Sequence, residues 1–181
     1  MSRFGPPDPA HAAIPDVAVE VLLFRLDGPG RLAYRELRRR WSPPETPDTL
    51  ALRLAGIDGP APPATVSHST SWRCDPQGRI VLTYALLPDP DPLQPAVTLP
   101  PVGVLCSGDP LLPSPSALHA HHVAAHAVRH LGQLTEHDPV VRAAADRRPE
   151  LWRVVTALAA TMAVGSHEKA HSRELSQSPA G

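Results

Sequence analysis

The sequence predicts an α+β protein, with a small antiparallel sheet covered by C-terminal helices. Three observations support this fold class. Residues 17–26 form a run of β-branched and aliphatic residues, typical of a strand buried on at least one face. Residues 64–87 carry the pattern of a β-hairpin, and about 115–164 are rich in alanine and poor in proline. Because the strands come first and the helices last, we expect helices packed against antiparallel strands and not the alternating units of a parallel sheet.

The first part of the chain is expected to hold a strand, an ambiguous segment and a short helix. The strand at 17–26 ends at the turn-forming sequence DGPG. The segment RLAYRELRRRW at 31–41 fits either a second strand leaving this turn or a short helix. A short helix follows, with Thr46 or Asp48 as its N-cap and Gly56 as its stop signal.

The hairpin is the most specific local signal. The sequence Asp-Pro-Gln-Gly at 75–78 has proline and glycine at the second and fourth positions of a type I turn. A second strand at 80–87 follows this turn. Pro100 and Pro101 interrupt the next apolar segment, as expected of an edge strand or a bulge. Alternation before the turn predicts one face with Val66, His68, Thr70 and Trp72, and the other with Ser67, Ser69, Ser71 and Arg73.

Three helices are predicted in the last third of the chain. The first covers 116–134 and is capped by Ser114 or Ser116. The second covers about 138–147, with a proline in its first turn. The third begins at 149 and keeps apolar residues at helical spacing to about 164.

Length and composition predict a single domain at 16–164, between a disordered lead at 1–15 and a disordered tail at 165–181. Hydrophobic residues make up 42% of the chain and aromatic residues only 4%, so alanine, valine and leucine must fill the core. Lys169 is the single lysine among 17 basic residues, and asparagine is absent. This usage indicates a GC-rich gene, of the kind found in some bacteria, which inflates the proline and arginine counts.

Charge and hydropathy narrow the expected partners. A net charge of −1 gives no overall attraction to nucleic acid or to an anionic membrane, so neither partner is expected. We find no apolar run of about 18 residues and no signal peptide, and we therefore expect a cytoplasmic protein. Cys74 and Cys106 are isolated in the sequence and are interpreted as reduced thiols.

Histidine provides the main candidate site. On a helix, His119, His122, His126 and His130 fall within about 80° of one another, and neutral imidazoles at i, i+4 can chelate a divalent transition metal. The apolar arc of this helix is centred about 130° away, so the histidines form either a solvated stripe or one wall of a cleft. A ligand pocket is the second hypothesis, lined by part of this stripe and by His68, Thr70, Trp72 and Arg73 of the hairpin. A distance of about 5 Å between His68 and the stripe would favour such a site.

A second histidine pattern lies near the C-terminus. The string HEKAH at 167–171 matches H-E-x-x-H, the zinc-binding pattern of metallopeptidases. On a helix its two imidazoles share one face, beside a glutamate that could act as general base. The neighbouring residues are polar, and Glu174 is the one candidate third ligand in the short remaining chain. We therefore interpret the match as part of the tail.

The segment RELRRRW resembles, over three residues, the R-E-L core of the Nudix box. In that family, glutamates after R-E-L hold the Mg²⁺ that activates water at a pyrophosphate. This sequence has Arg39 and Arg40 at those positions, and reversed charge forbids the metal site. Arg35, Arg38, Arg39 and Arg40 could instead contact phosphate, or form a solvated basic face beside Trp41.

Because each catalytic motif lacks a required partner, we expect a non-enzymatic binding or interaction module for a small molecule or a protein, and leave enzymatic activity open. One alternative is a metal-binding protein or metallohydrolase that uses the histidine-rich helix 119–130. A second alternative is a degenerate Nudix-like domain that lacks the catalytic carboxylates. The ligand, the partner and the oligomeric state do not follow from the sequence.

Overall fold

The computed structural model describes residues 16–103, 105 and 118–175, with side chains described as far as Met162. The predicted disordered lead at 1–15 and the end of the predicted tail at 176–181 lie outside the described residues. In chain order the elements are β1 (Val17–Leu26), β2 (Leu32–Arg40), α1 (Pro47–Leu54), β3 (Val66–Cys74), β4 (Ile80–Leu87), β5 (Val97–Thr98), α2 (Ala120–His137), α3 (Pro139–Asp146) and α4 (Pro149–Leu175).

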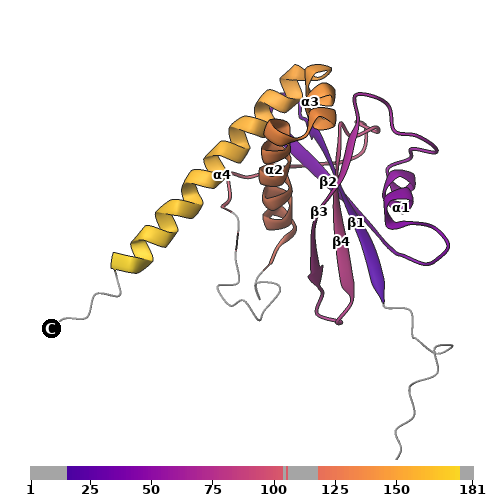
Figure 1. Ribbon diagram of the computed structural model, residues 1–181, viewed down its shortest axis with the longest axis horizontal. Helices are drawn as coiled ribbons and strands as arrows, with labels where there is room; N and C mark the ends of the chain where they lie inside the picture. Colours follow the sequence, from indigo (N-terminus) through magenta and orange to yellow (C-terminus); the bar gives the residue numbers. More distant parts are fainter. Residues whose placement is uncertain (1–15, 104, 106–117, 176–181) are drawn as a thin grey trace, which may run out of the picture.

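The strands form one mixed sheet in the order β3-β4-β1-β2-β5 (Figure 1). The β1–β2 and β3–β4 hairpins are antiparallel, but β1 and β4 run parallel at the centre. The predicted α+β class is confirmed, and the prediction of an antiparallel sheet is wrong at this pairing. The connection through α1 is the reason. It carries the chain across one face of the sheet, so that β4 of the second hairpin lies beside β1 and runs parallel to it.

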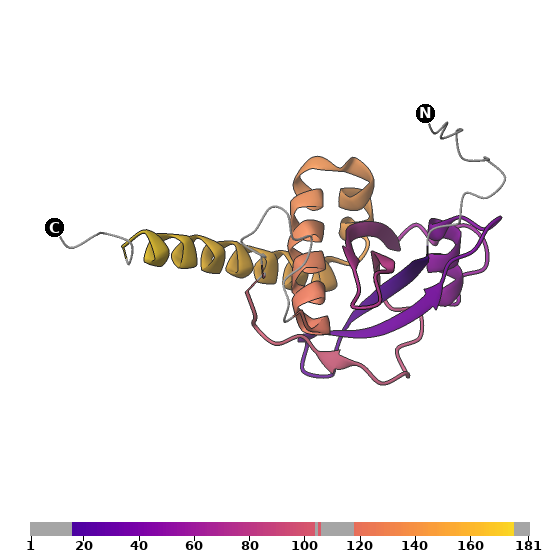
Figure 2. The same ribbon diagram turned by 90° about the horizontal axis from the view of Figure 1, so that it is seen from below.

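The central strand β1 is buried on both faces of the sheet. Leu22 and Phe24 belong to the core under α2, α3 and α4, whereas Val21 and Leu23 belong to the core under α1. Burial on both sides explains why residues 17–26 form a continuous apolar run and not an alternating one. The helical layers lie on opposite sides of the sheet in both views of the ribbon (Figures 1 and 2).

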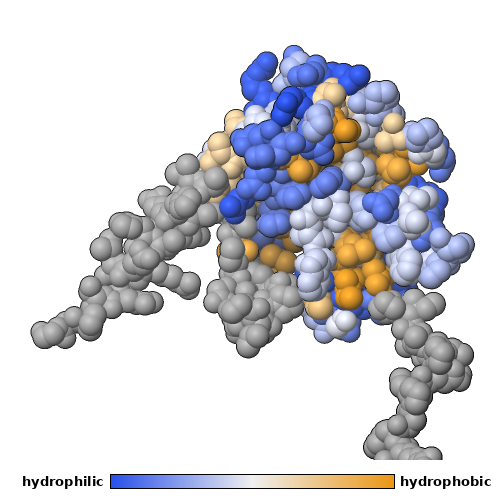
Figure 3. All heavy atoms as spheres, viewed as in Figure 1, coloured by the Kyte–Doolittle hydropathy of each residue, from blue (hydrophilic) through white to orange (hydrophobic). Residues whose placement is uncertain are grey.

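The helix α1 covers its face of the sheet incompletely. The Thr46 hydroxyl caps it by accepting a hydrogen bond from the Thr49 amide at 3.2 Å, which decides between the two predicted caps. Leu50 and Ala51 pack on the sheet, but a helix of eight residues is too short to shield the whole face. Apolar patches accordingly interrupt the hydrophilic surface in Figure 3. The partly buried apolar residues of this layer are Leu37, Trp41, Leu52, Leu54, Ile57 and Leu82.

The segment 31–41, for which a strand and a helix were both predicted, contains strand β2. It pairs with β1 along its whole length, from Leu32 opposite Leu26 to Arg40 opposite Ala18. Gly30 closes the turn between the two strands with a φ of 80°, a conformation that glycine adopts without strain.

The predicted β3–β4 hairpin is present, and it contains a β-bulge. Ser69 lies opposite Tyr84 and Ser71 lies opposite Thr83, so Thr70 is an additional residue in β3. A bulge of this kind adds one position to one strand only. Every side chain of β3 beyond Thr70 therefore changes face relative to a regular strand.

This change of face corrects the predicted grouping of hairpin residues. Arg73 lies on the same face as His68, toward the C-terminal helices, although alternation placed the two on opposite faces. Trp72 lies on the other face and is 59% exposed. The predicted ligand pocket of His68, Thr70, Trp72 and Arg73 is therefore not assembled as a single group.

The C-terminal helices differ from the prediction mainly at their ends. The first is α2, which begins at Ala120 with His119 as N-cap, and the predicted serine caps lie outside the described residues. The third is α4, whose backbone stays helical to Leu175 and beyond the expected end near 164. The H-E-x-x-H string at 167–171 is thus on a helix, but its side chains lie outside the described part of the structure. No helix among the described residues is long and apolar enough to span a membrane.

The close crossing of α2 and α4 depends on two small residues. A Cβ atom added to Gly132 would lie 2.4 Å from the Cβ atom of Ala159. Real carbon atoms do not approach so closely, so the two helices pack at this distance only because position 132 has no side chain.

We expect Gly132→Ala to lower the free energy of unfolding by about 1–3 kcal/mol, although alanine is the better helix former. The new methyl group would overlap with Ala159 and push the helices apart. Urea denaturation checks this, with Gly132→Ala/Ala159→Gly as the matched control that relieves the overlap. A single variant as stable as the wild type would contradict the crossing.

Candidate functional site

The edge strand β3 contacts α2 at the bulge, where His126 holds the backbone of Thr70. The imidazole donates a hydrogen bond to the Thr70 carbonyl group. The Thr70 hydroxyl donates a second hydrogen bond to the Thr83 carbonyl oxygen at 3.3 Å. Because a bulged residue leaves the regular ladder, its polar groups need partners of this kind. His126 therefore has a structural role as a half-buried hydrogen-bond donor.

His130, one turn further along α2, stacks on His68 of β3. The ring centroids are 5.3 Å apart and the planes are inclined by 22°. This is close to the separation of about 5 Å that favours a site over a fully solvated stripe. The Nε2 atom of His130 is buried and has no hydrogen-bond partner in the described part of the structure. The α2–β3 contact thus brings together four of the predicted site residues, His68, Thr70, His126 and His130.

Both α2 histidines of this contact have a pKa below the usual histidine value, which favours the neutral form. Burial lowers the pKa of His126, and the positive charge of Arg129 lowers it further despite the hydrogen bond to Thr70. Burial also lowers the pKa of His130, with a smaller contribution from the neighbouring His68 and His126. Imidazoles in a dry, crowded contact lose more hydration on protonation than they regain, so the neutral form is favoured.

The remaining predicted metal ligands lie at the other end of the histidine stripe. The His119 amide donates a hydrogen bond to Nδ1 of His122 at 3.2 Å, which helps to close the first turn of α2. Both rings also contact His121. The four predicted ligands are therefore divided between two places on α2. Among the described side chains, no three of the His, Cys, Asp and Glu type are arranged to hold a metal ion.

A buried ion pair connects β3 to the centre of the sheet. Both terminal nitrogens of Arg73 donate to the carboxylate of Glu20, which is 1% exposed. The Thr83 hydroxyl donates to the same carboxylate at 3.1 Å and accepts from Arg73 at 2.9 Å. Because every oxygen of the carboxylate has a donor, the charge is tolerated in the sheet.

The neighbouring strand adds a second carboxyl group to this network. Partial desolvation raises the pKa of Glu36, and the nearby negative charge of Glu20 raises it further. Four adjacent strands each contribute one polar residue, namely Glu20, Glu36, Arg73 and Thr83. Only Arg73 was predicted as a site residue. Glu20 had a signal that was overlooked, since it is the one charged residue in the apolar run before Arg25.

The arginine-rich segment of β2 is largely engaged in intramolecular ion pairs. Arg35 binds Asp89, Arg38 binds Asp75, and Arg40 binds Asp16. These pairs reduce the positive charge available to a phosphate. The R-E-L string, residues 35–37, lies within the extended strand β2.

Asp89 is the most enclosed of these carboxylates, and it anchors the chain after β4. Burial alone would raise its pKa, but hydrogen bonds from Arg35, Arg25 and the Asp91 amide hold that pKa below its usual value. The Asp89 amide also donates to the Phe24 carbonyl oxygen at 2.7 Å. The end of β1 and the loop after β4 are therefore fixed to each other.

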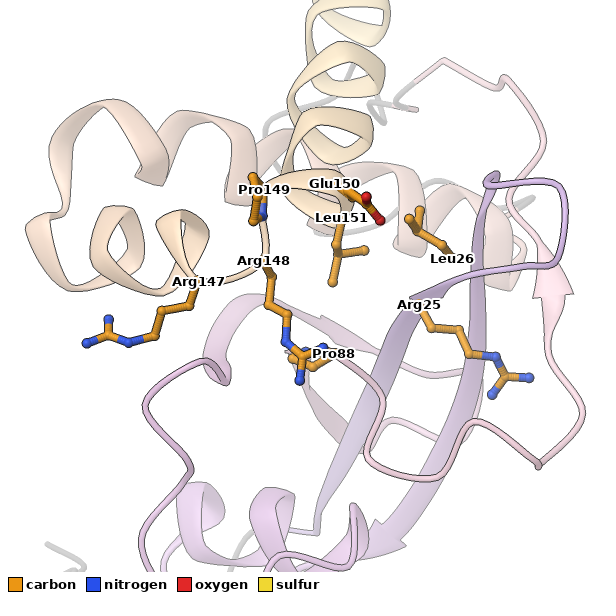
Figure 4. Close-up of a pocket in the computed structure, with 8 residues that line it drawn as sticks. All are labelled: Arg25, Leu26, Pro88, Arg147, Arg148, Pro149, Glu150 and Leu151. Carbon is orange, nitrogen blue, oxygen red and sulfur yellow. The ribbon is translucent and has the colours of Figure 1, made fainter.

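Beside this anchor, a cavity of about 400 Å³ separates the end of β1 from the start of α4 (Figure 4). Leu26 and Leu151 supply apolar surface, together with two prolines. In Figure 4 the Arg148 side chain extends toward Pro88, whereas Arg147 points away from the cavity. The sequence analysis missed this site because its residues come from three separate segments. The lining residues are Arg25, Leu26, Pro88, Arg147, Arg148, Pro149, Glu150 and Leu151.

The charged groups around this cavity differ in how they are bonded. Arg25 is directed to Asp89 and to the carbonyl oxygens of Asp91 and Gln94, so it contributes its aliphatic stem. Arg147 donates to the Ala143 carbonyl oxygen at 2.6 Å. The guanidinium group of Arg148 has no hydrogen bond or ion pair with any described residue.

Comparisons of this chain with protein-family models, with curated proteins and with solved structures found no significant match.

Acidification below the usual histidine pKa of about 6.5 is expected to destabilise the protein. The pKa values of His126 and His130 are lower in the folded state than the usual 6.5, so the unfolded chain binds more protons in this range. The contribution of these two histidines to stability is therefore fully present above their pKa in the unfolded chain. It is lost as the pH falls through their pKa in the folded protein. Urea unfolding at a series of pH values measures this slope.

The variant His130→Phe keeps a stacked ring without a titrating group and should reduce the slope. His137→Gln removes an imidazole from the exposed end of α2 and is the matched control. An identical slope in His130→Phe and the wild type would show that the α2–β3 contact does not titrate in the folded protein.

The buried ion pair leads to a separate prediction. Removing its cation with Arg73→Met leaves the Glu20 carboxylate buried and unpaired, and should cost about 3 kcal/mol of unfolding free energy. The double variant Arg73→Met/Glu20→Met should recover most of this loss. Arg79→Met breaks a more exposed pair with Asp75 and should cost less than about 1 kcal/mol. Equal losses in the Arg73 and Arg79 variants would contradict the buried network.

Proposed function

We propose that this protein is a non-enzymatic binding module, and that it takes a small anion with an apolar body into the cavity between β1 and α4. The cavity itself is the observation that carries the proposal. Its volume of about 400 Å³ falls in the range of small-molecule sites, and it combines apolar walls with a few polar groups. This refines the expected small-ligand module and moves its pocket away from the predicted hairpin residues.

The apolar part of the ligand would contact the side chains of Leu26 and Leu151. Leu151 is buried against the core and Leu26 is partly buried, so both are held in place by packing. The rings of Pro88 and Pro149 add rigid apolar surface that loses little conformational freedom when a ligand binds. An aromatic or branched group suits such a surface.

The anionic part of the ligand would pair with Arg148. Its guanidinium group is the one arginine head at this cavity that has no bonded partner among the described residues, and Figure 4 shows it reaching toward Pro88. A planar guanidinium can donate two parallel hydrogen bonds to a carboxylate or sulfonate. Glu150, on the other side of the cavity, would disfavour a second negative charge in the ligand.

The anchor beside the cavity supports a preformed site. Asp89 ties Arg25 and Arg35 together at distances of 2.8 Å, which fixes Pro88 next to the end of β1. A wall that is already ordered does not lose entropy on binding. The described lining contains one carboxyl group and no histidine, serine or cysteine, which favours binding over catalysis.

Titration with 8-anilinonaphthalene-1-sulfonate, followed by its fluorescence, tests the proposal. We expect saturable binding, with one molecule in this cavity. Arg148→Ala should weaken binding roughly fivefold, because it removes a solvent-accessible charged partner. Leu26→Trp should abolish binding by filling the cavity.

Arg147→Ala is the matched control, since this neighbouring arginine points away from the cavity, and it should change the affinity less than about twofold. Circular dichroism and urea midpoints establish that each variant is folded. Binding that is unchanged in both Arg148→Ala and Leu26→Trp would disprove the proposed site, as would a wild-type protein that does not bind the dye.

A further inference from the structure

A second, larger cavity lies on the other side of the β1–β2 turn, between the sheet edge and α4. Its volume is about 550 Å³, and a neighbouring cavity of about 200 Å³ shares Pro101 and Leu158 with it. Because two lining residues are common to both, the cavities are consecutive parts of one groove. The larger part is lined by Gly30, Arg31, Leu32, Thr98, Leu99, Pro100, Pro101, Val154 and Leu158.

The sequence explains why the groove exists. β5 pairs with β2 over only two residues, and the last bond of this edge joins the Leu99 amide to the Leu32 carbonyl oxygen at 2.8 Å. Pro100 and Pro101 then follow, and proline has no N–H group to continue a ladder. The chain leaves β2 at this point, so α4 passes an incomplete sheet edge and leaves space beside it.

The walls of the groove are almost entirely apolar. Leu32 and Leu99 form part of the main core, with 1% and 5% exposure. Val154 and Leu158 on α4 are only partly buried and line the open space. In the adjoining part, Val102 and Met162 continue the apolar surface. Covering this surface with an alkyl chain would remove it from water.

One end of the groove carries a cationic side chain that is paired with Asp27 through one of its three guanidinium nitrogens. Arg31 is the only charged residue among the described residues that line either part, and its side chain is 63% exposed. Its Nε atom is bonded to Asp27 at 3.1 Å, and no described residue bonds to its two terminal nitrogens. Those nitrogens remain available to an oxyanion at the mouth of the groove.

We infer that this groove binds a single-chain amphiphile with a carboxylate head, such as a medium-chain fatty acid. The alkyl chain lies along α4 against Leu99, Val154 and Leu158, and the carboxylate pairs with Arg31. The apolar walls and the single arginine at one end favour an alkyl chain with an anionic head. A peptide is disfavoured as the ligand, because its backbone would bury amide groups without partners. The inference is independent of the cavity beside Arg148.

Isothermal titration with decanoate, below the concentration at which it forms micelles, tests the inference. We expect a site in this groove whose affinity falls by up to about fourfold for each methylene removed on going to octanoate and hexanoate. Decyltrimethylammonium has the same chain with a cationic head and should bind at least tenfold more weakly.

Variants locate the site. Val154→Trp fills the groove and should remove the decanoate site in it, whereas Ala157→Trp places the same side chain on the exposed side of α4 and should not. Arg31→Ala changes only a surface charge and should remove the preference for decanoate over the cationic amphiphile. Arg148→Ala and Leu26→Trp should leave the site that Val154→Trp removes unchanged, which separates this site from the other cavity.

Several results would overturn the inference. These are a wild-type protein that does not bind decanoate, equal binding of the two amphiphiles, or decanoate affinity that is the same in Val154→Trp and the wild type. Unfolding midpoints confirm that the tryptophan variants are folded, and the Arg31→Ala result stands even if Val154→Trp is destabilised.

Discussion

The burial of β1 on both faces is the constraint that shapes the rest of this molecule. A strand with apolar side chains on both sides needs a packed layer above and below it. The C-terminal helices supply one layer and α1 supplies the other. The two layers are unequal, since α1 has eight residues and the opposite layer contains three helices. The side with three helices accordingly forms the larger core and contains the cavities beside α4.

The position of α4 decides where cavities form. The helix is drawn close to α2 at Gly132 and Ala159, where a side chain on the glycine would not fit. On its other side, α4 faces a turn and a strand edge that prolines cut short. A rigid helix cannot follow both surfaces, so space remains beside Leu151 and beside Val154 and Leu158. The candidate ligand sites thus result from a close contact on one side of α4 and an incomplete edge on the other.

Much of the fold could be predicted from local pattern. The hairpin, the Thr46 cap, the short helix after Asp138 and the end of pairing near Pro100 all depend on turn and cap chemistry that neighbouring residues fix. Two features could not be predicted in this way. The parallel pairing of β1 with β4 depends on how two hairpins dock. The bulge at Thr70 coincides with a tertiary contact with His126, and it places Arg73 and Trp72 on faces opposite to those predicted.

The candidate sites were harder to predict than the fold. The sequence left open whether His68 lies near the histidine-rich helix. The structure brings them into contact, and the contact is filled by a ring stack and a backbone hydrogen bond. Composition drew attention to histidine and arginine, which the structure mostly uses for internal contacts. The cavity beside Arg148 combines residues about 60 and 120 positions apart, and no sequence spacing marks such a group.

Intermolecular nuclear Overhauser effects offer the most direct measurement of the central claim. In a complex of the full chain with 8-anilinonaphthalene-1-sulfonate, the account predicts contacts between the aromatic protons of the probe and the methyl groups of Leu26 and Leu151. Contacts confined to the methyl groups of other residues, such as Leu99 or Leu158, would contradict the proposed binding site.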